Sequence, residues 1–251
     1  MRATQAKLPK ALGLRPSANG KPSASSRRTR IVPVTPERWP DLAALFGEKG
    51  ACAGCWCMWM RLPRAQFDRQ RGAGNRRALR ALVGKRPPGL IAYVDGEPAG
   101  WVAVAPREEY VRLENSRVLE PVEGESVWSA PCFFIGKTHR GAGLTAALLE
   151  AAAAHAARNG ARAIEGYPNV NRAERQPPAF VWTGFESTFR RAGFEEIARR
   201  SPTRPILRKA LGRRPSADGR PSATRRASAT RKPSATRRAR PRRTTSGVAR
   251  G

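Results

Sequence analysis

The aromatic residues mark the part of this chain that can fold. All six tryptophans, three tyrosines and eight phenylalanines of the 251 residues lie between Trp39 and Phe194. The segments on either side are rich in Pro, Ser, Ala, Lys and Arg and offer little apolar surface to offset the entropy cost of ordering. We therefore expect one compact domain over residues 29–211, with disordered basic tails at 1–28 and 212–251.

Most of the positive charge lies outside the expected domain. Of the formal net charge of +29, residues 1–30 contribute +8 and residues 208–251 contribute +14, which leaves +7 for residues 31–207. Clustered Lys and Arg neutralise phosphates without reading sequence. We therefore expect the tails to bind nucleic acid or another polyanion nonspecifically.

The sequence also indicates a compartment. The N-terminus has no uninterrupted apolar run of the kind found in signal peptides, and Glu150 and His155 interrupt the alanine-rich stretch at 144–157. We expect a cytoplasmic protein without membrane contact, in which the four cysteines remain thiols. Whether it acts as a monomer or a homodimer is left open.

The hydrophobic patterns of the middle segment predict a mixed α/β sheet. Asp95-Gly96 between two apolar runs is a strong hairpin signal, and Pro36 suits the first turn of a helix. Helices are predicted at 35–46, 65–83, 144–158 and 178–191, and strands at 31–34, 90–94, 99–105, 127–135, 161–165, 194–199 and 205–208.

A glycine turn between the strand at 127–135 and the helix at 144–158 is the most informative segment. Such a turn presents backbone N–H groups at the positive end of a helix and suits a phosphate or pyrophosphate. Gly141 and Gly143 would allow close approach of the anion. The segment fits neither G-x-G-x-x-G, because position 146 is Ala, nor the P-loop. An ordinary strand-to-helix loop is the alternative.

This turn resembles the pyrophosphate loop of the GNAT acetyltransferases, R/Q-x-x-G-x-G/A. Arg140, Gly143 and Thr145 occupy its positions, with Thr145 in place of the usual Gly or Ala. A later aromatic followed by Gly-Phe matches Phe189 and the pair at 193–194. The resemblance covers residues 29–211 and implies a GNAT-like, mostly antiparallel sheet with a central splay, flanked by about four helices.

The resemblance also implies a function. Acetyl-CoA would be the co-substrate, and the product would be the N-acetylated form of a primary amine, either a small molecule or a peptide. Pantetheine would pair with the strand edge like an added strand. The implied cofactor-binding residues are Phe133, Phe134, Ile135, Arg140, Gly141, Ala142, Gly143, Leu144 and Thr145. The alternative is a basic nucleic-acid-binding protein that uses a GNAT-like domain as a scaffold.

Acetyl transfer needs a neutral amine, and an alkylamine of pKa about 10.4 is almost fully protonated at neutral pH. Many GNAT relatives place a Tyr where this chain has Phe189, and use it to protonate the departing thiolate. Glu165 and Tyr167, at the end of a strand that faces the expected splay, are the candidate catalytic residues for proton transfer. The alternative is that neither residue is catalytic, and that Glu165 is simply an exposed acid at a strand end and Tyr167 a half-buried aromatic.

Residues 51–60 combine cysteines with large apolar side chains. Zinc needs four ligands, whereas C-x-x-C-x-C supplies three, so we expect no metal. In GNAT proteins the segment between the first two helices usually lines the acceptor pocket. Trp56, Trp59 and Met60 would then give that pocket apolar walls that favour a flat or apolar acceptor. The same side chains can equally fill the core.

Overall fold

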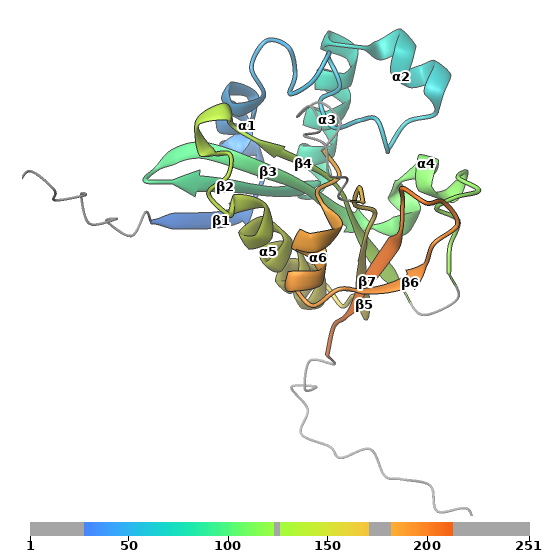
Figure 1. Ribbon diagram of the computed structural model, residues 1–251. Coiled ribbons are helices and arrows are strands. Elements are labelled where there is room, and N and C mark those ends of the chain that lie inside the picture. The colour runs from blue at the N-terminus through green and yellow to red at the C-terminus, as the bar shows by residue number, and fades with distance from the viewer. Residues whose placement is uncertain (1–27, 123–125, 171–181, 213–251) are drawn as a thin grey trace, which may run out of the picture. The chain divides into compact units, whose positions relative to one another are not determined.

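The computed structural model describes residues 28–122, 126–170 and 182–212 (Figure 1). All of them belong to the first of two units of the chain, residues 1–214. The second unit, 215–251, and nearly all of both predicted tails lie outside the described residues, so the disorder of the tails stays a prediction. No described helix is long and apolar enough to cross a membrane.

Seven strands form one open sheet in the order β1-β2-β3-β4-β5-β7-β6. Among the described strands, β4 and β5 are the one parallel pair, and every other neighbouring pair is antiparallel. The predicted mixed, mostly antiparallel sheet is therefore confirmed. The strands are β1 Thr29–Pro33, β2 Gly89–Val94, β3 Glu97–Pro106, β4 Val127–Ile135, β5 Ala163–Gly166, β6 Glu195–Ala198 and β7 Ile206–Ala210.

The β2-β3 hairpin forms where local turn chemistry predicts it. Asp95 and Gly96 both have positive φ, +51° and +93°. Two such residues make the tight turn whose twist matches that of the flanking strands. Val94 consequently pairs directly with Glu97.

Six α-helices and three short 3-10 helices accompany the sheet in the described part of the chain. They are α1 Trp39–Phe46, α2 Arg64–Gln70, α3 Ala73–Lys85, α4 Val111–Glu114, α5 Leu144–Arg158, α6 Glu186–Arg191, η1 Pro36–Arg38, η2 Arg107–Glu109 and η3 Lys137–His139. The bounds of α5 are those predicted, whereas α4 was not anticipated. The predicted helix at 35–46 begins instead as the 3-10 turn η1, and Thr35 makes no side-chain capping bond.

Two predicted helices differ from those observed. The single helix expected at 65–83 is broken into α2 and α3, because Arg71 has extended ψ and Gly72 has φ +78°. In the helix expected at 178–191, the described helical part is α6 alone, and residues 178–181 lie outside the described residues.

Helices cover both faces of the sheet (Figure 1). Side chains alternate along β3: Val102 and Val104 join the core under α5 and α6, whereas Trp101 and Ala103 join the core under α1 and α3. A smaller cluster that includes Tyr110 and Tyr167 fills the space beside α4. The two large cores therefore lie on opposite sides of the same strands.

The strands β4 and β5 separate near the middle of the sheet. Pairing between them ends at Ser129 and Glu165, although β4 continues to Ile135. A bulge in β4 accompanies the separation. Ala103 pairs with Cys132 and Ala105 pairs with Ser129, so β4 has one residue more than β3 between these two pairs. The C-terminal half of β4 therefore presents an edge that β5 does not cover. This separation is the predicted central splay.

Gly166 in β5 allows the close packing of α6 at this point. A Cβ on Gly166 would overlap the Phe189 ring, whereas a Cβ on Gly84 in α3 would meet open space. We expect Gly166→Ala to lower the free energy of unfolding by about 1–3 kcal/mol through overpacking. Gly84→Ala, the matched control, should raise it by about 1 kcal/mol through helix propensity. Urea unfolding measures both, and equal effects would contradict the packing described here.

Candidate active site

The loop before α5 has the backbone conformation that its glycines predict. Gly141 and Gly143 have φ of +79° and +77°, in the left-handed region that side chains disfavour. A Cβ at either position would meet nothing within 4 Å. Conformation, rather than lack of space within the protein, therefore accounts for both glycines.

The start of α5 presents unused hydrogen-bond donors. Within the described part of the chain, the backbone N–H groups of residues 141–145 have no acceptor, and the first bonds of the helix run from Ala146 and Ala147 to the carbonyl of Gly143. No acidic residue lies in the first turn. The positive end of this 15-residue helix is therefore free to bind an anion.

The exposed edge of β4 is already engaged by the protein itself. The Phe133 N–H donates to the Trp182 carbonyl at 2.6 Å. The Arg140 Nε donates to the Ile135 carbonyl at 3.2 Å, although the Arg140 side chain is exposed. A strand-like ligand on this edge would have to displace both bonds.

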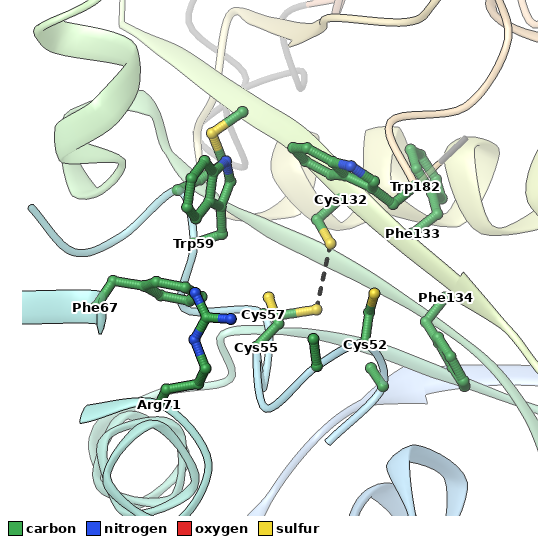
Figure 2. A pocket seen from close by; sticks show the side chains of 13 residues that line it. Cys52, Cys55, Cys57, Trp59, Phe67, Arg71, Cys132, Phe133, Phe134 and Trp182 are labelled. Atoms are coloured by element: carbon green, nitrogen blue, oxygen red, sulfur yellow. Dashed lines mark hydrogen bonds between the residues drawn. The ribbon is translucent and has the colours of Figure 1, made fainter. Parts of the chain in front are cut away.

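A cavity of about 310 Å³ adjoins this half of β4 (Figure 2). Its walls come from the loop at 51–60, from α2, from β4 and from Trp182, and they are almost entirely apolar. The lining residues are Ala51, Cys52, Ala53, Cys55, Cys57, Trp59, Met60, Phe67, Arg71, Cys132, Phe133, Phe134 and Trp182.

Two of the three residues predicted for the acceptor pocket line this cavity. Trp59 is half-buried and Met60 is buried in its wall. Trp56 lies elsewhere: it is 4% exposed and stacks on Trp39 with ring centroids 6.0 Å apart. The structure therefore assigns Trp56 to the core, the alternative that the sequence left open for all three.

Three cavity residues were not indicated by any sequence pattern. Phe67 and Arg71 belonged to a predicted helix with no assigned partner, and Trp182 followed the predicted start of another helix. Figure 2 shows Phe67 and Arg71 on one side of the cavity and Trp182 near Cys132. Only the folded chain brings these segments together.

Two of the cavity thiols, Cys57 and Cys132, are hydrogen-bonded to each other. The Sγ atoms of Cys57 and Cys132 lie 3.3 Å apart, and the Trp101 Nε1 donates to Cys57 at 3.1 Å. The hydrogen bond with Cys57, together with burial, raises the pKa of Cys132 well above its usual value. Burial raises the pKa of Cys55 to about 12. Among the described residues, no three His, Cys, Asp or Glu side chains are placed to hold a metal ion.

Glu165 and Tyr167 lie in a buried polar cluster where β4 and β5 separate. The Tyr167 hydroxyl donates to Glu165 at 2.9 Å, lies 2.7 Å from the Ser129 hydroxyl and accepts a bond from Arg107 at 3.0 Å. Arg208 forms an ion pair with Glu165 at 2.6 Å. Burial, followed by the charge of Glu165, raises the pKa of Tyr167 well above its usual value. The strand-end acid is therefore buried, and neither residue lines the cavity.

Phe189 lies at the same junction, on the α5 and α6 side of the sheet. It is fully buried and packs edge-to-face on Phe133 and Phe194, with ring centroids 6.0 and 5.1 Å away. It lies beside Phe133 of β4, and its side chain offers no proton.

The sequence was also compared with known proteins. The family model described as the acetyltransferase (GNAT) family matches residues 53–175, which span the splay, the glycine turn and α5. This part of the chain belongs to the GNAT family. No curated protein sequence matches the chain.

Solved structures similar to this GNAT chain are distant in sequence. A GNAT acetyltransferase from Streptococcus pneumoniae is 16% identical, with a TM-score of 0.45 over 74% of this chain and 100% of that one. PaiA N-acetyltransferase from Thermoplasma acidophilum, solved with coenzyme A, is 12% identical, with a TM-score of 0.42 over 73% and 99%. The yncA protein from Salmonella typhimurium, solved with its cofactor acetyl-CoA, is 14% identical, with a TM-score of 0.45 over 78% and 99%. The family assignment itself depends on the sequence match.

The thiol environments predict an order of reactivity. We expect iodoacetamide to alkylate the exposed Cys52 first, and Cys55 and Cys132 much more slowly, because raised pKa values keep the last two protonated. Peptide mass spectrometry over time measures each site. In urea all four thiols should react alike. Native-state alkylation of Cys55 or Cys132 as fast as that of Cys52 would contradict the environments described.

Proposed function

We propose that this GNAT protein is an acetyl-CoA-dependent N-acetyltransferase that acetylates the amino group of a small molecule or peptide. One observation carries the proposal: the uncovered half of β4 continues through η3 to the free N–H groups at 141–145 and also forms a wall of the apolar cavity. One strand thereby contacts a site for an anionic donor and a site for an acceptor.

The donor site follows from the free polar groups. The pyrophosphate would accept hydrogen bonds from the N–H groups at 141–145, at the positive end of α5. The exposed Arg140 can exchange its bond with Ile135 for a phosphate oxygen. Pantetheine would then take the places on β4 that Arg140 and the Trp182 carbonyl occupy.

The reaction is an addition followed by an elimination. The amine nitrogen attacks the thioester carbonyl carbon, the C–S bond breaks, and coenzyme A leaves as a thiolate that takes up a proton. A thiol of pKa about 8.5 is released as thiolate at pH 7 at a cost of only about 2 kcal/mol. The absence of a hydroxyl on Phe189 is therefore compatible with turnover.

The catalytic roles of Glu165 and Tyr167 remain our proposal from the sequence. Since the pKa of Tyr167 is raised, this residue would donate a proton and not accept one. Glu165 already accepts bonds from Arg208 and Tyr167. Tyr167 also bonds Ser129 of β4, so a second role is to fix the distance between the separated strands.

Thr145 provides a test of the donor site. Thr145→Glu would place a carboxylate beside the pyrophosphate, while an acid in the first turn of α5 favours the helix by about 0.3–1 kcal/mol. We expect a folded protein whose affinity for coenzyme A falls by about tenfold or more. Calorimetry and thermal unfolding measure the two effects.

The conservative variant Thr145→Ser is the control and should bind coenzyme A almost normally. A substitution at Gly143 would be less informative, because its positive φ adds backbone strain to any charge effect. Unchanged affinity for coenzyme A in a folded Thr145→Glu protein would show that the donor does not bind at the start of α5.

Tyr167→Phe separates the two roles of the tyrosine. We expect a loss of about 1–3 kcal/mol in stability, because Ser129 and Arg107 lose a buried partner. If Tyr167 donates the proton as proposed, kcat per folded molecule should fall as well, whereas an unchanged kcat would leave it the positioning role alone. A general acid contributes about 100-fold or more, so a kcat loss of that size would assign the proton transfer to Tyr167. Tyr93→Phe, on the opposite part of the sheet, is the control.

A further inference from the structure

We infer that the acceptor is an aromatic amine, uncharged at neutral pH, that carries an acidic group on the far side of its ring. An aminobenzoate is the simplest molecule of this class. The inference rests on the proposed acetyl transfer and specifies its acceptor.

The shape of the cavity suits one substituted ring. Its volume of about 310 Å³ is about twice that of a ~150 Å³ cavity that holds benzene. Trp59 and Phe67 meet at 84°, with centroids 5.0 Å apart, and Phe134 and Trp182 supply aromatic surface from the other segments. Such walls bury a flat apolar body efficiently.

The described cavity walls offer no partner for an ammonium group. None of the described lining residues is Asp or Glu, and Arg71 is the one permanently charged residue among them. Cys55 and Cys132 remain neutral thiols because their pKa values are raised. A cationic amine would therefore lose its hydration without gaining an opposite charge.

Two of the cavity's aromatic rings, Trp59 and Phe67, already hold the protein's own cations against their faces. The Arg112 guanidinium lies 3.7 Å from the centroid of the Trp59 ring, and the Arg64 guanidinium lies 5.5 Å from it. The Arg71 guanidinium lies 5.5 Å from the centroid of the Phe67 ring. At these two rings an ammonium group would meet a positive charge that is already in place and repels it.

Arg71 provides the complementary group for an acid on the acceptor. Figure 2 shows its side chain on the α2 side of the cavity, across from Phe133 and Phe134 of β4. Its side chain is 52% exposed and pairs with Asp68, which also pairs with Arg64. A guanidinium has donors for a second carboxylate. An acceptor anchored there would direct the opposite end of its ring toward β4.

An aromatic amine also fits the chemistry of the site. Its nitrogen lone pair is delocalised into the ring, so the amine is neutral before it binds and needs no base to become a nucleophile. The nitrogen attacks the thioester carbon, the C–S bond breaks, and the proton lost from nitrogen ends on the departing thiolate through water. The products are an N-aryl acetamide and coenzyme A. The transfer to such an amine therefore needs no base among the described residues that line the cavity.

Two amines that differ by one methylene group test the inference directly. We expect 4-aminobenzoate to give a higher kcat/KM than 4-(aminomethyl)benzoate by about tenfold or more at neutral pH in a thiol-release assay, because the second amine is protonated. The kcat/KM for 4-aminobenzoate should be flat between about pH 6.5 and 8.5. The opposite preference, or no turnover of either amine, would overturn the inference.

Two further arms complete the experiment. Arg71→Ala should raise KM for 4-aminobenzoate by about fivefold, leave kcat similar and leave aniline unaffected. Arg69→Ala, in the last turn of α2 two residues before Arg71 and outside the cavity lining, is the control. An equal effect of Arg71→Ala on both amines, or none on either, would overturn the role of the acidic group.

Calorimetry with acetyl-CoA is run first, and a lack of binding would overturn the proposed function itself.

Discussion

The buried cluster at the junction of β4 and β5 is the constraint on which the rest of the site depends. Glu165 is 1% exposed, and a lone carboxylate there would be costly. Arg208 from β7 and the Tyr167 hydroxyl compensate it, and Ser129 ties the same hydroxyl to β4. The strands are thereby held together up to this point and separate beyond it. Both the exposed edge of β4 and the cavity beside it result from that separation.

The two sides of the separated strand differ in chemistry. On one side the protein presents backbone donors and the positive end of a helix, which suit a highly charged ligand. On the other side it presents thiols and aromatic rings, with its guanidinium groups packed against the rings. A charged donor and a neutral acceptor can therefore approach the same strand without competing for the same groups.

Local chemistry explains which parts of the fold the sequence could predict. The hairpin follows from Asp95-Gly96, and α5 follows from a glycine turn and an Asn-Gly end, signals that involve only neighbouring residues. The burial of Glu165 could not be predicted from the sequence, because it depends on Arg208, and β7 lies beside β5 only in the folded sheet.

The cavity residues, too, depend on contacts that form only in the folded chain. Trp56 and Trp59 are three residues apart in an irregular loop, and Trp56 has a φ of +46°. No periodicity could indicate which ring faces the core and which the cavity. Trp182 lies far along the chain from both. The uncovered edge of β4 and the loop at 51–60 could be expected from the family resemblance, whereas Phe67, Arg71 and Trp182 could not.

The bond between the Phe133 N–H and the Trp182 carbonyl makes Trp182 a shared element, because its side chain also lines the cavity. A donor that takes the Phe133 N–H displaces this residue, and an acceptor packed on the indole holds it in place or moves it. The two binding free energies are then coupled, and the coupling must be equal in both directions. The affinity for each substrate would thus depend, through this one residue, on whether the other substrate is bound.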